Sequence, residues 1–533
     1  MSSDRSPFDD EFNELVKEQL EKWKVPGLSI AIINGSNTYS NSRSGIGSSQ
    51  TQQAYGQAEL PNRNRNRPAR AMTTDALFAT CSTTKAFTGA ATSIVIQDSK
   101  KTSDPIDWDT TLSSLIPEDF VLEDDYTTKN ITLEDALSHR SGMPHHNWQF
   151  ALFPMQGVTL ASLVRAMRYM PLVAPLRTKY HYSNNMYLAV SHALETRTGE
   201  GLGALMKNRI WDPLGMAQTY FSPGEARADT TSTAEHVQAY DWISTADGGR
   251  FVERPEHDWE GNSGAGAIVS NVLDYARWVR EFIERNGPLK GHDSLTVPRT
   301  IILHTGDVDL PSPYRAYALG WVVDNYRGQH LYSHSGGWPG YSSWVGFVPE
   351  KKFGIVVMGN SSSARFAVFR VVTYLLDRYL GLTNDQGYQE KIAASLVRQA
   401  DSWKRSLETE DIKAVKQRLF SAGLPDPPIP HALHLSRYTG TYEHLTNVTV
   451  TFKIGDDGLI ANLWDRAIPC DLSLQHVSGE FFVGSLLSEG HTLMPPFTVE
   501  FYINPAGVVS KVGLHLESTM KPEEKLWFVR SES

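Results

Sequence analysis

Apolar and polar positions follow two different periods along this chain, and the change of period predicts where helices and strands lie. Residues 10–24 carry apolar side chains at helical spacing, which predicts an amphipathic helix. The apolar run over residues 27–33 predicts a buried strand soon after it. A second helical stripe follows Ser82, at Ala86, Phe87, Ala90, Ala91, Ile94 and Val95. We therefore expect a helix that begins close to Ser82.

The middle of the chain, from about residue 100 to 280, has the pattern of a mostly helical region with loops. Helices are expected at 185–198, 202–210 and 272–284. Strand-like runs return at 319–323, 329–333, 343–348 and 354–360, and a helix is expected at 365–380. A strand, a helical insertion and then further strands predict a split α/β domain with an all-helical subdomain.

The pattern changes again after residue 385. Residues 386–430 have the character of a helical linker that ends in the proline-rich segment 425–430. Short alternating runs follow, at 448–453, 459–464, 481–483, 498–503, 509–515 and 526–529. Such runs, separated by Gly, Asp and Pro, predict a β-barrel or sandwich. The 533 residues therefore divide into a domain at 1–385, a linker at 386–430 and a small all-β domain at 431–533.

Ser82 and Lys85 are the first candidate for chemistry. At this spacing the two side chains share one face near the start of the expected helix. An amine held against a hydroxyl is a general base beside a nucleophile, and free N–H groups at a helix N-terminus suit an oxyanion. Taken alone the pattern is weak, because a surface serine and a solvated lysine can have the same spacing.

Two further segments strengthen this interpretation. Tyr182-Ser183-Asn184 lies downstream, and His334-Ser335-Gly336-Gly337 lies in the strand-like stretch that begins near Gln329. Either segment alone is ordinarily a turn or a loop. Their order, after the Ser-x-x-Lys pair, resembles the serine β-lactamase and penicillin-binding-protein superfamily. The Tyr-x-Asn form is similar to the class C branch, with its related esterases, D-aminopeptidases and transesterases (peptidase family S12).

The resemblance extends over residues 10–385 and carries expectations for the fold. Residues 25–31, 131–143 and 211–216 are similar to the family's first core strand, its "L-L-x-H-x-S-G" segment and its "P-L-G-M" turn. The implied fold is α+β, an α/β sandwich with an antiparallel sheet and an all-helical subdomain, and residues 261–266 become a loop near the pocket. The Tyr438–Tyr442 segment resembles the start of a lipocalin-like domain appended to some members. For that domain we rank stabilisation and packing above dimerisation or shaping of the pocket.

The resemblance also assigns roles. Ser82 would attack a carbonyl and become acylated, and either Lys85 or Tyr182 would take its proton. Asn184 would orient the lysine and the substrate. The backbone N–H groups of Ser82 and Gly337 would hold the oxyanion. The two glycines Gly336 and Gly337 would let substrate approach the strand closely.

His334 departs from the pattern of β-lactamases and D-Ala-D-Ala peptidases, which usually have lysine there to bind a substrate carboxylate. Histidine is mostly neutral near pH 7. With Ser335 and Gly336 it is expected to bind or orient substrate. Trp338 and Tyr341 could wall an acyl pocket, although aromatic residues beside a strand are more often core. We therefore expect an ester, thioester or amide without a carboxylate next to the scissile bond.

Net charge and cysteine content limit which partners and metals this chain is expected to bind. A net charge of −10 and a pI near 5.9 argue against a nucleic-acid binder. The arginine-rich run 61–70 opposes this trend, either as a solvated loop or as a docking patch for an acyl carrier protein. Two cysteines and the adjacent His145-His146 do not suggest a metal site, so we expect neither a metal nor a cofactor.

The remaining expectations concern location and activity. The chain opens without a secretory pattern, and its apolar runs are too short to span a membrane, so we expect a cytosolic enzyme. Its oligomeric state stays open. The predicted function is a serine hydrolase with an acyl-enzyme on Ser82, acting on a small metabolite or peptide, possibly in a secondary-metabolite pathway. The alternatives are an acyltransferase or transesterase, a β-lactamase or D-peptidase, and an inactive binding protein.

Overall fold

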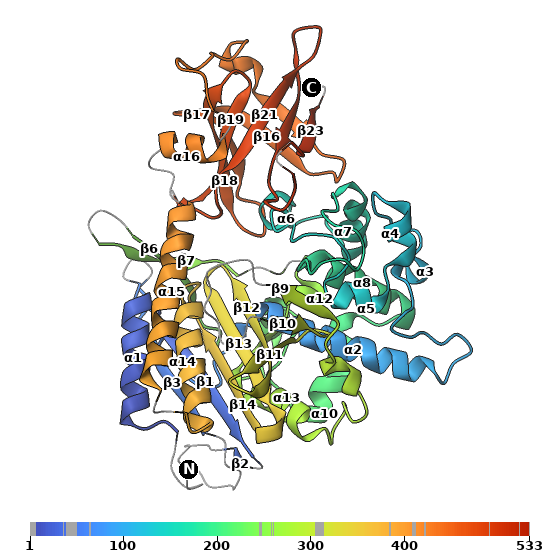
Figure 1. The fold of residues 1–533 in the computed structure, drawn as a ribbon, viewed down its shortest axis with the longest axis vertical. Coiled ribbons are helices and arrows are strands. Elements are labelled where there is room, and N and C mark those ends of the chain that lie inside the picture. The colour runs from blue at the N-terminus through green and yellow to red at the C-terminus, as the bar shows by residue number, and fades with distance from the viewer. Residues whose placement is uncertain are drawn as a thin grey trace.

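A computed structural model describes most of the chain (Figure 1). The described residues are 7–35, 37–38, 51–62, 66–244, 248–256, 258, 261–303, 314–382, 385–407, 412–420, 423–489, 491–521 and 523–531. Residues 1–6, two arginines of the basic run (Arg63 and Arg65) and the last two residues lie outside them. Within the described parts of the chain, no helix combines the length and the apolar character that a membrane crossing needs.

A ten-stranded antiparallel sheet forms the centre of the first part of the chain. Its strands run in the order β4-β3-β1-β14-β13-β12-β11-β10-β9, and β2 pairs with β1. Their bounds are β1 Gly27–Asn34, β2 Asn37–Thr38, β3 Thr51–Glu59, β4 Arg70–Ala71, β9 Thr300–Leu303, β10 Tyr314–Tyr317, β11 Val322–Tyr326, β12 Gln329–Trp338, β13 Tyr341–Val348 and β14 Phe353–Gly359. The first strand pairs with the last one, β14, so the helical insertion splits the sheet in sequence but not in space.

Helices cover both faces of this sheet. On one face α1 (Asp10–Trp23) and α14 (Ala364–Tyr379) share an apolar core with β1 and β14, which includes Phe12, Val16, Ile30, Val357 and Val371. On the other face lies α13 (Val272–Glu284), and the turn Cys81–Thr83, which leads into α2 (Thr84–Ser99), lies beside β12 and β13. Almost every side chain of α2 is buried, because the helix runs between the sheet and the helical subdomain.

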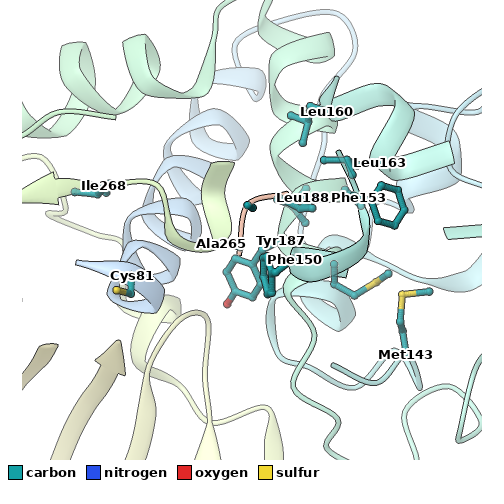
Figure 2. Close-up of a cluster of buried hydrophobic side chains, with 14 of the residues drawn as sticks. Cys81, Met143, Phe150, Phe153, Leu160, Leu163, Tyr187, Leu188, Ala265 and Ile268 are labelled. Atoms are coloured by element: carbon teal, nitrogen blue, oxygen red, sulfur yellow. The ribbon is translucent and has the colours of Figure 1, made fainter. Parts of the chain in front are cut away.

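The helical subdomain packs on the far side of α2. It comprises α3 Leu112–Leu115, α4 Asp125–Asn130, α5 Leu133–Leu137, α6 Gln149–Leu152, α7 Leu160–Ala166, α8 Asn184–Thr198, α9 Leu202–Met206, α10 Asp212–Leu214 and α11 Pro223–Ala228. Figure 2 shows buried side chains that extend from Cys81 past Tyr187 and Leu188 of α8 to Leu160 and Leu163 of α7. One continuous core therefore connects the start of α2 with the subdomain.

The carboxy-terminal part forms a closed barrel. Eight strands pair in a ring, because β18 pairs with both β17 and β19, and β20 is attached beside β19. Aromatic side chains fill its interior, among them Tyr438, Tyr442, Phe452, Phe482, Phe501 and Phe528. The strands are β15 Gly440–Glu443, β16 Thr449–Gly455, β17 Gly458–Leu463, β18 Cys470–Ser478, β19 Phe481–Ser488, β20 His491–Thr492, β21 Phe497–Ile503, β22 Val509–Leu514 and β23 Leu526–Arg530.

Two helices, α15 (Gln386–Leu407) and α16 (Ile412–Leu419), lie between the sheet and the barrel in sequence. The barrel sits above the first part of the chain, against α6 and the hairpin of β6 (Ala239–Ile243) and β7 (Arg250–Arg254) (Figure 1). Arg254 of β7 donates a buried hydrogen bond to the Ser488 hydroxyl at 2.9 Å. The amide of Ile468 donates to the carbonyl of Phe150, also at 2.9 Å. The two parts therefore share hydrogen bonds and not only a linker.

Three local expectations need correction. The glycine-rich segment 261–266 is not all loop, because Ser263–Gly266 form the short helix α12. Helix α13, expected within the helical region, packs on the sheet. The strand expected at 319–323 begins only at Val322, after a turn closed by a hydrogen bond from Ala318 N to Trp321 O. In that turn Gly320 has φ +94° and lies directly against the backbone of α2 at Lys85 and Ala86.

We expect Gly320→Ala to destabilise the protein strongly. A Cβ atom at Gly320 would lie 2.6 Å from Lys85 O and from Ala86 Cα, in addition to the strained φ. Such overpacking costs about 1–3 kcal/mol beyond the conformational strain. Gly328→Ala is the matched control, because φ is +88° there and nothing lies within 4 Å of the new Cβ. Thermal unfolding should show the larger loss for Gly320→Ala, and equal losses would contradict the close packing.

Candidate active site

The nucleophile turn, Cys81–Thr83, is a single 3-10 turn directly before α2. Cys81 has φ 54°, in the left-handed region that non-glycine residues rarely adopt. Its neighbours hold this geometry, because the Ser343 hydroxyl donates to Thr80 O at 2.7 Å and the Tyr275 hydroxyl donates to Thr80 Oγ1 at 2.8 Å. Burial raises the pKa of the Cys81 thiol, so this side chain stays a neutral packing group. Ser82 is left partly exposed toward a cavity.

Lys85 is fully buried and lies next to Ser82. Its Nζ is 2.7 Å from Asn184 Oδ1, 2.8 Å from Ala265 O and 3.4 Å from Ser82 Oγ. Burial holds the pKa of Lys85 well below its usual value. A neutral amine has two N–H bonds and one lone pair. Two carbonyl oxygens take the N–H bonds here, which leaves the lone pair for the Ser82 hydroxyl.

Tyr182 lies at the cavity wall, and the Lys85 Nζ is 4.8 Å from the centre of its ring. Burial raises the pKa of the Tyr182 phenol, although a hydrogen bond with Ser82 lowers it in part. The phenol is therefore protonated at neutral pH. His139 packs on the same ring at 4.3 Å between centroids, and its Nδ1 accepts from Ser183 N at 3.0 Å. These contacts orient the Tyr182–Asn184 segment.

Asn184 connects the lysine to a residue that sequence reasoning missed. Its Oδ1 accepts from Lys85, and its Nδ2 donates to Asn147 Oδ1 at 3.2 Å. Asn147 is exposed and lines the cavity. No signal in the sequence singles it out.

Strand β12 has an open edge beside the nucleophile turn. Strand β11 pairs with it only as far as Ser333, so the part from His334 to Trp338 pairs with β13 alone. Gly337 lines the cavity, with nothing within 4 Å of the place of a Cβ. Its N–H group stays a predicted oxyanion donor. Ser335 is exposed on the same strand but does not belong to the described cavity wall.

Three expectations around this strand are corrected. Gly336 faces the protein, since a Cβ there would lie 2.3 Å from Thr80 O, so its small size serves packing against the nucleophile turn. His334 is buried behind the strand, where it contacts the Tyr317 hydroxyl and Ser335 O at 2.8 and 2.7 Å. Burial lowers the pKa of His334 to about 3, so it is neutral, and it does not line the cavity. Tyr341 is likewise buried away from the cavity, with its hydroxyl 3.3 Å from Glu256 Oε1.

The cavity in front of Ser82 has a volume of about 1360 Å³. Its walls come from the nucleophile turn, the helical subdomain, the end of β12, the linker helices and the barrel. Trp338 lines the cavity and packs edge-on against Phe150 at 5.1 Å between ring centroids. Large apolar side chains dominate, including Trp148, Phe150, Met155, Phe221, Trp338, Trp403, Leu493, Met494 and Phe497. From the sequence we rank shaping of the pocket below stabilisation for the barrel, and the barrel supplies the last three of these side chains.

Fold and site together define the class of protein. An antiparallel sheet split by a helical subdomain, with Ser in the turn before the helix between them and Lys in its first turn, is typical of serine hydrolases with the β-lactamase/transpeptidase fold. A family model described as Beta-lactamase matches residues 12–374. The chain therefore belongs to the β-lactamase family. A second model, described as "Domain of unknown function (DUF3471)", matches residues 424–530.

Several known proteins are similar to this chain. "Unguisins hydrolase ungD'" from Aspergillus campestris is 34% identical and the match covers 98% of this chain and 92% of that protein. "Unguisins hydrolase ungD" from Aspergillus violaceofuscus is 32% identical, with 99% and 91% covered. A D-aminopeptidase from Cereibacter sphaeroides is 24% identical over 59% of this chain and 55% of its own.

Solved structures support the fold. The octameric penicillin-binding protein homologue from Pyrococcus abyssi has a TM-score of 0.58 at 21% identity, covering 97% of this chain and 99% of that one. The D-amino acid amidase from Ochrobactrum anthropi SV3 has a TM-score of 0.51 at 20% identity, covering 71% and 99%. These similarities confirm the predicted α+β fold.

Proposed function

We propose that this protein is an amide hydrolase that works through an acyl-enzyme on Ser82. The observation that carries the proposal is the set of contacts at Lys85, whose Nζ lies 2.7 and 2.8 Å from two carbonyl oxygens and 3.4 Å from Ser82 Oγ. In a neutral amine the two carbonyl oxygens accept both N–H bonds, and the lone pair is then left for the Ser82 hydroxyl. A buried amine with a lowered pKa is a competent general base at neutral pH.

In the proposed reaction Ser82 Oγ attacks the scissile carbonyl carbon while Lys85 Nζ accepts the hydroxyl proton. The new C–O bond displaces the carbonyl π electrons onto oxygen, and the N–H groups of Ser82 and Gly337 stabilise that oxyanion. When the C–N bond breaks, the leaving nitrogen takes a proton from Lys85, directly or through the Tyr182 phenol. Water then attacks the acyl carbon of the ester while Lys85 Nζ accepts a proton from it. The bond from that carbon to Ser82 Oγ breaks, the acid is released, and the proton on Lys85 passes to Ser82 Oγ.

Lys85 is the better candidate for the base. Burial disfavours the charged form of both groups, so it lowers the pKa of Lys85 and raises that of Tyr182. The same burial therefore yields a neutral amine, which can accept a proton, and a neutral phenol, which can donate one. Tyr182 suits the transfer of a proton to the leaving group.

The substrate that fits is a bulky, apolar amide or peptide. The cavity exceeds the range of about 300–1,000 Å³ that is usual for drug-sized ligands. Neutral, buried His334 offers no cation for a carboxylate beside the scissile bond. The relatives named unguisins hydrolase and D-aminopeptidase support hydrolysis of an amide, and the former supports a role in secondary metabolism.

Acyl transfer would use the same residues and differs only in the acceptor. A carrier protein delivering a thioester would need free positive charge at the basic run. In its described part, Arg67 pairs with Glu59 at 2.6 Å and Arg70 pairs with Glu235 at 3.1 Å. These internal ion pairs favour a structural role for this part of the run, so we prefer hydrolysis.

A peptide panel tests the substrate class. We expect kcat/KM to rise at least about tenfold from a single D-amino acid amide to N-acylated apolar peptides, because remote contacts contribute to catalysis. Product masses distinguish hydrolysis from transfer. The matched control is each peptide with a free carboxylate next to the scissile bond, which should react poorly. Efficient turnover of nitrocefin or ampicillin would contradict the proposal.

A further inference from the structure

The barrel contacts the chain segment that carries Asn147. Residues 146–155 of the catalytic part are bound at several points by residues 465–517 of the barrel. Pro154 and Arg466 form an isolated antiparallel bridge, and Met155 N donates to Asp465 O at 3.3 Å. With the bond from Ile468 N to Phe150 O, these contacts hold the later half of the segment through its backbone.

Glu517 of the barrel holds the start of the same segment. Its Oε2 accepts from the backbone N–H of His146 at 2.9 Å, and its Oε1 accepts from the Thr519 hydroxyl at 2.8 Å. The side chain is only 6% exposed, although it lines the cavity. Among the described residues, neither Lys nor Arg forms an ion pair with it. Its hydrogen bonds therefore define its position.

The backbone of His146 has a strained conformation that its hydrogen bond to Glu517 helps to hold. Its φ is 45°, in the left-handed region, and such a conformation persists only where the surroundings determine it. The His146 ring is also held, because its Nε2 lies 3.1 Å from Pro171 O and its Nδ1 accepts from Trp148 Nε1 at 3.1 Å. The next residue is Asn147, so the conformation of His146 sets where the Asn147 amide points.

A continuous chain of contacts thus connects the barrel with the base. Glu517 binds His146 N, Asn147 Oδ1 accepts from Asn184 Nδ2, and Asn184 Oδ1 accepts from Lys85 Nζ. We propose that Glu517 is a positioning residue of the active site, and that the barrel completes the catalytic machinery by fixing Asn147 and, through Asn184, Lys85. This inference rests on the proposed nucleophile but not on the identity of the substrate.

The test measures how fast a fluorophosphonate labels Ser82, which needs no natural substrate. Labelling at several probe concentrations separates the apparent binding constant from the maximal rate of phosphonylation. We expect Glu517→Ala to lower the maximal rate about 10- to 100-fold, as small misplacements of catalytic groups do, with binding unchanged. Glu517→Gln keeps an acceptor oxygen for His146 N and should retain most of the rate.

The alternatives give different results. Glu443→Ala, at an exposed glutamate of β15, is the control and should behave as wild type. If the barrel only stabilised the fold, Glu517→Ala would reduce the labelled fraction but not the rate of the folded molecules. If the charge of Glu517 bound the ligand directly, both Glu517→Gln and Glu517→Ala would weaken binding of the probe to the same extent. Either result overturns the inference, whereas an unlabelled wild type would instead refute the proposed function.

Discussion

Ser82→Ala should abolish turnover and covalent labelling while leaving the fold intact. Ser82 is partly exposed at the end of the cavity, and its hydroxyl contacts both Lys85 and Tyr182. Loss of a catalytic serine typically costs about 10⁶ in kcat, and at least about 10⁴ is expected here. Since the hydroxyl is not part of the core, thermal unfolding should barely change.

Intact-protein mass spectrometry after exposure to a fluorophosphonate measures this directly. Wild type should gain one adduct and Ser82→Ala none. Cys81→Ala is a useful comparison, because Cys81 is adjacent to Ser82 and also lines the cavity. An adduct that survives in Ser82→Ala but is lost in Cys81→Ala would transfer the role to the cysteine and refute the proposed mechanism.

Replacing Lys85 should have the second largest effect. Both Lys85→Met and Lys85→Arg should lower kcat/KM by about 10²–10⁴, the usual contribution of a general base, since neither side chain can accept a proton at neutral pH. In the proposed mechanism the neutral lysine is the active form. Because burial lowers the pKa of Lys85, kcat/KM should rise with pH and level off well below the range in which an ordinary lysine loses its proton.

The pH profile and the variant Tyr182→Phe decide between the two candidate bases. If Lys85 is the base, the acidic limb should vanish from the residual activity of Lys85→Met, and Tyr182→Phe should keep that limb. An acidic limb that is lost in Tyr182→Phe and kept in Lys85→Met would instead assign the proton transfer to the phenol.

Local patterns predicted much of the fold. The periods over 10–24, 27–33 and 272–284 correspond to α1, β1 and α13, and the run after Ser82 corresponds to α2. The all-β character of residues 431–533 is confirmed as a closed barrel. These elements could be predicted because each is defined by neighbouring residues. The strand expected at 319–323 was wrong because Gly320 is required by a contact with α2, which is far away in sequence.

The site could be predicted only where a motif marks it. Ser82, Lys85, Tyr182 and Asn184 lie together, and their catalytic roles stay predictions. Asn147 and Glu517 belong to no motif, and the bond between Glu517 and His146 spans 371 positions. His334 appeared in a motif, yet its burial is decided by the way β12 packs on Tyr317. Contacts of this kind depend on tertiary structure and leave no periodic signal.

The burial of Lys85 has a consequence for charge during the reaction. Burial disfavours the charged forms of the Lys85 amine, the His334 imidazole and the Tyr182 phenol, so the proposed mechanism starts from three uncharged groups. In the proposed acylation the oxyanion and the lysine ammonium arise in the same step and disappear in the same step. The pocket therefore never has to solvate a single new ion, only a short-lived dipole, and an apolar environment tolerates paired charges far better than an isolated one. Walls of tryptophan, phenylalanine and methionine are compatible with amide chemistry for this reason.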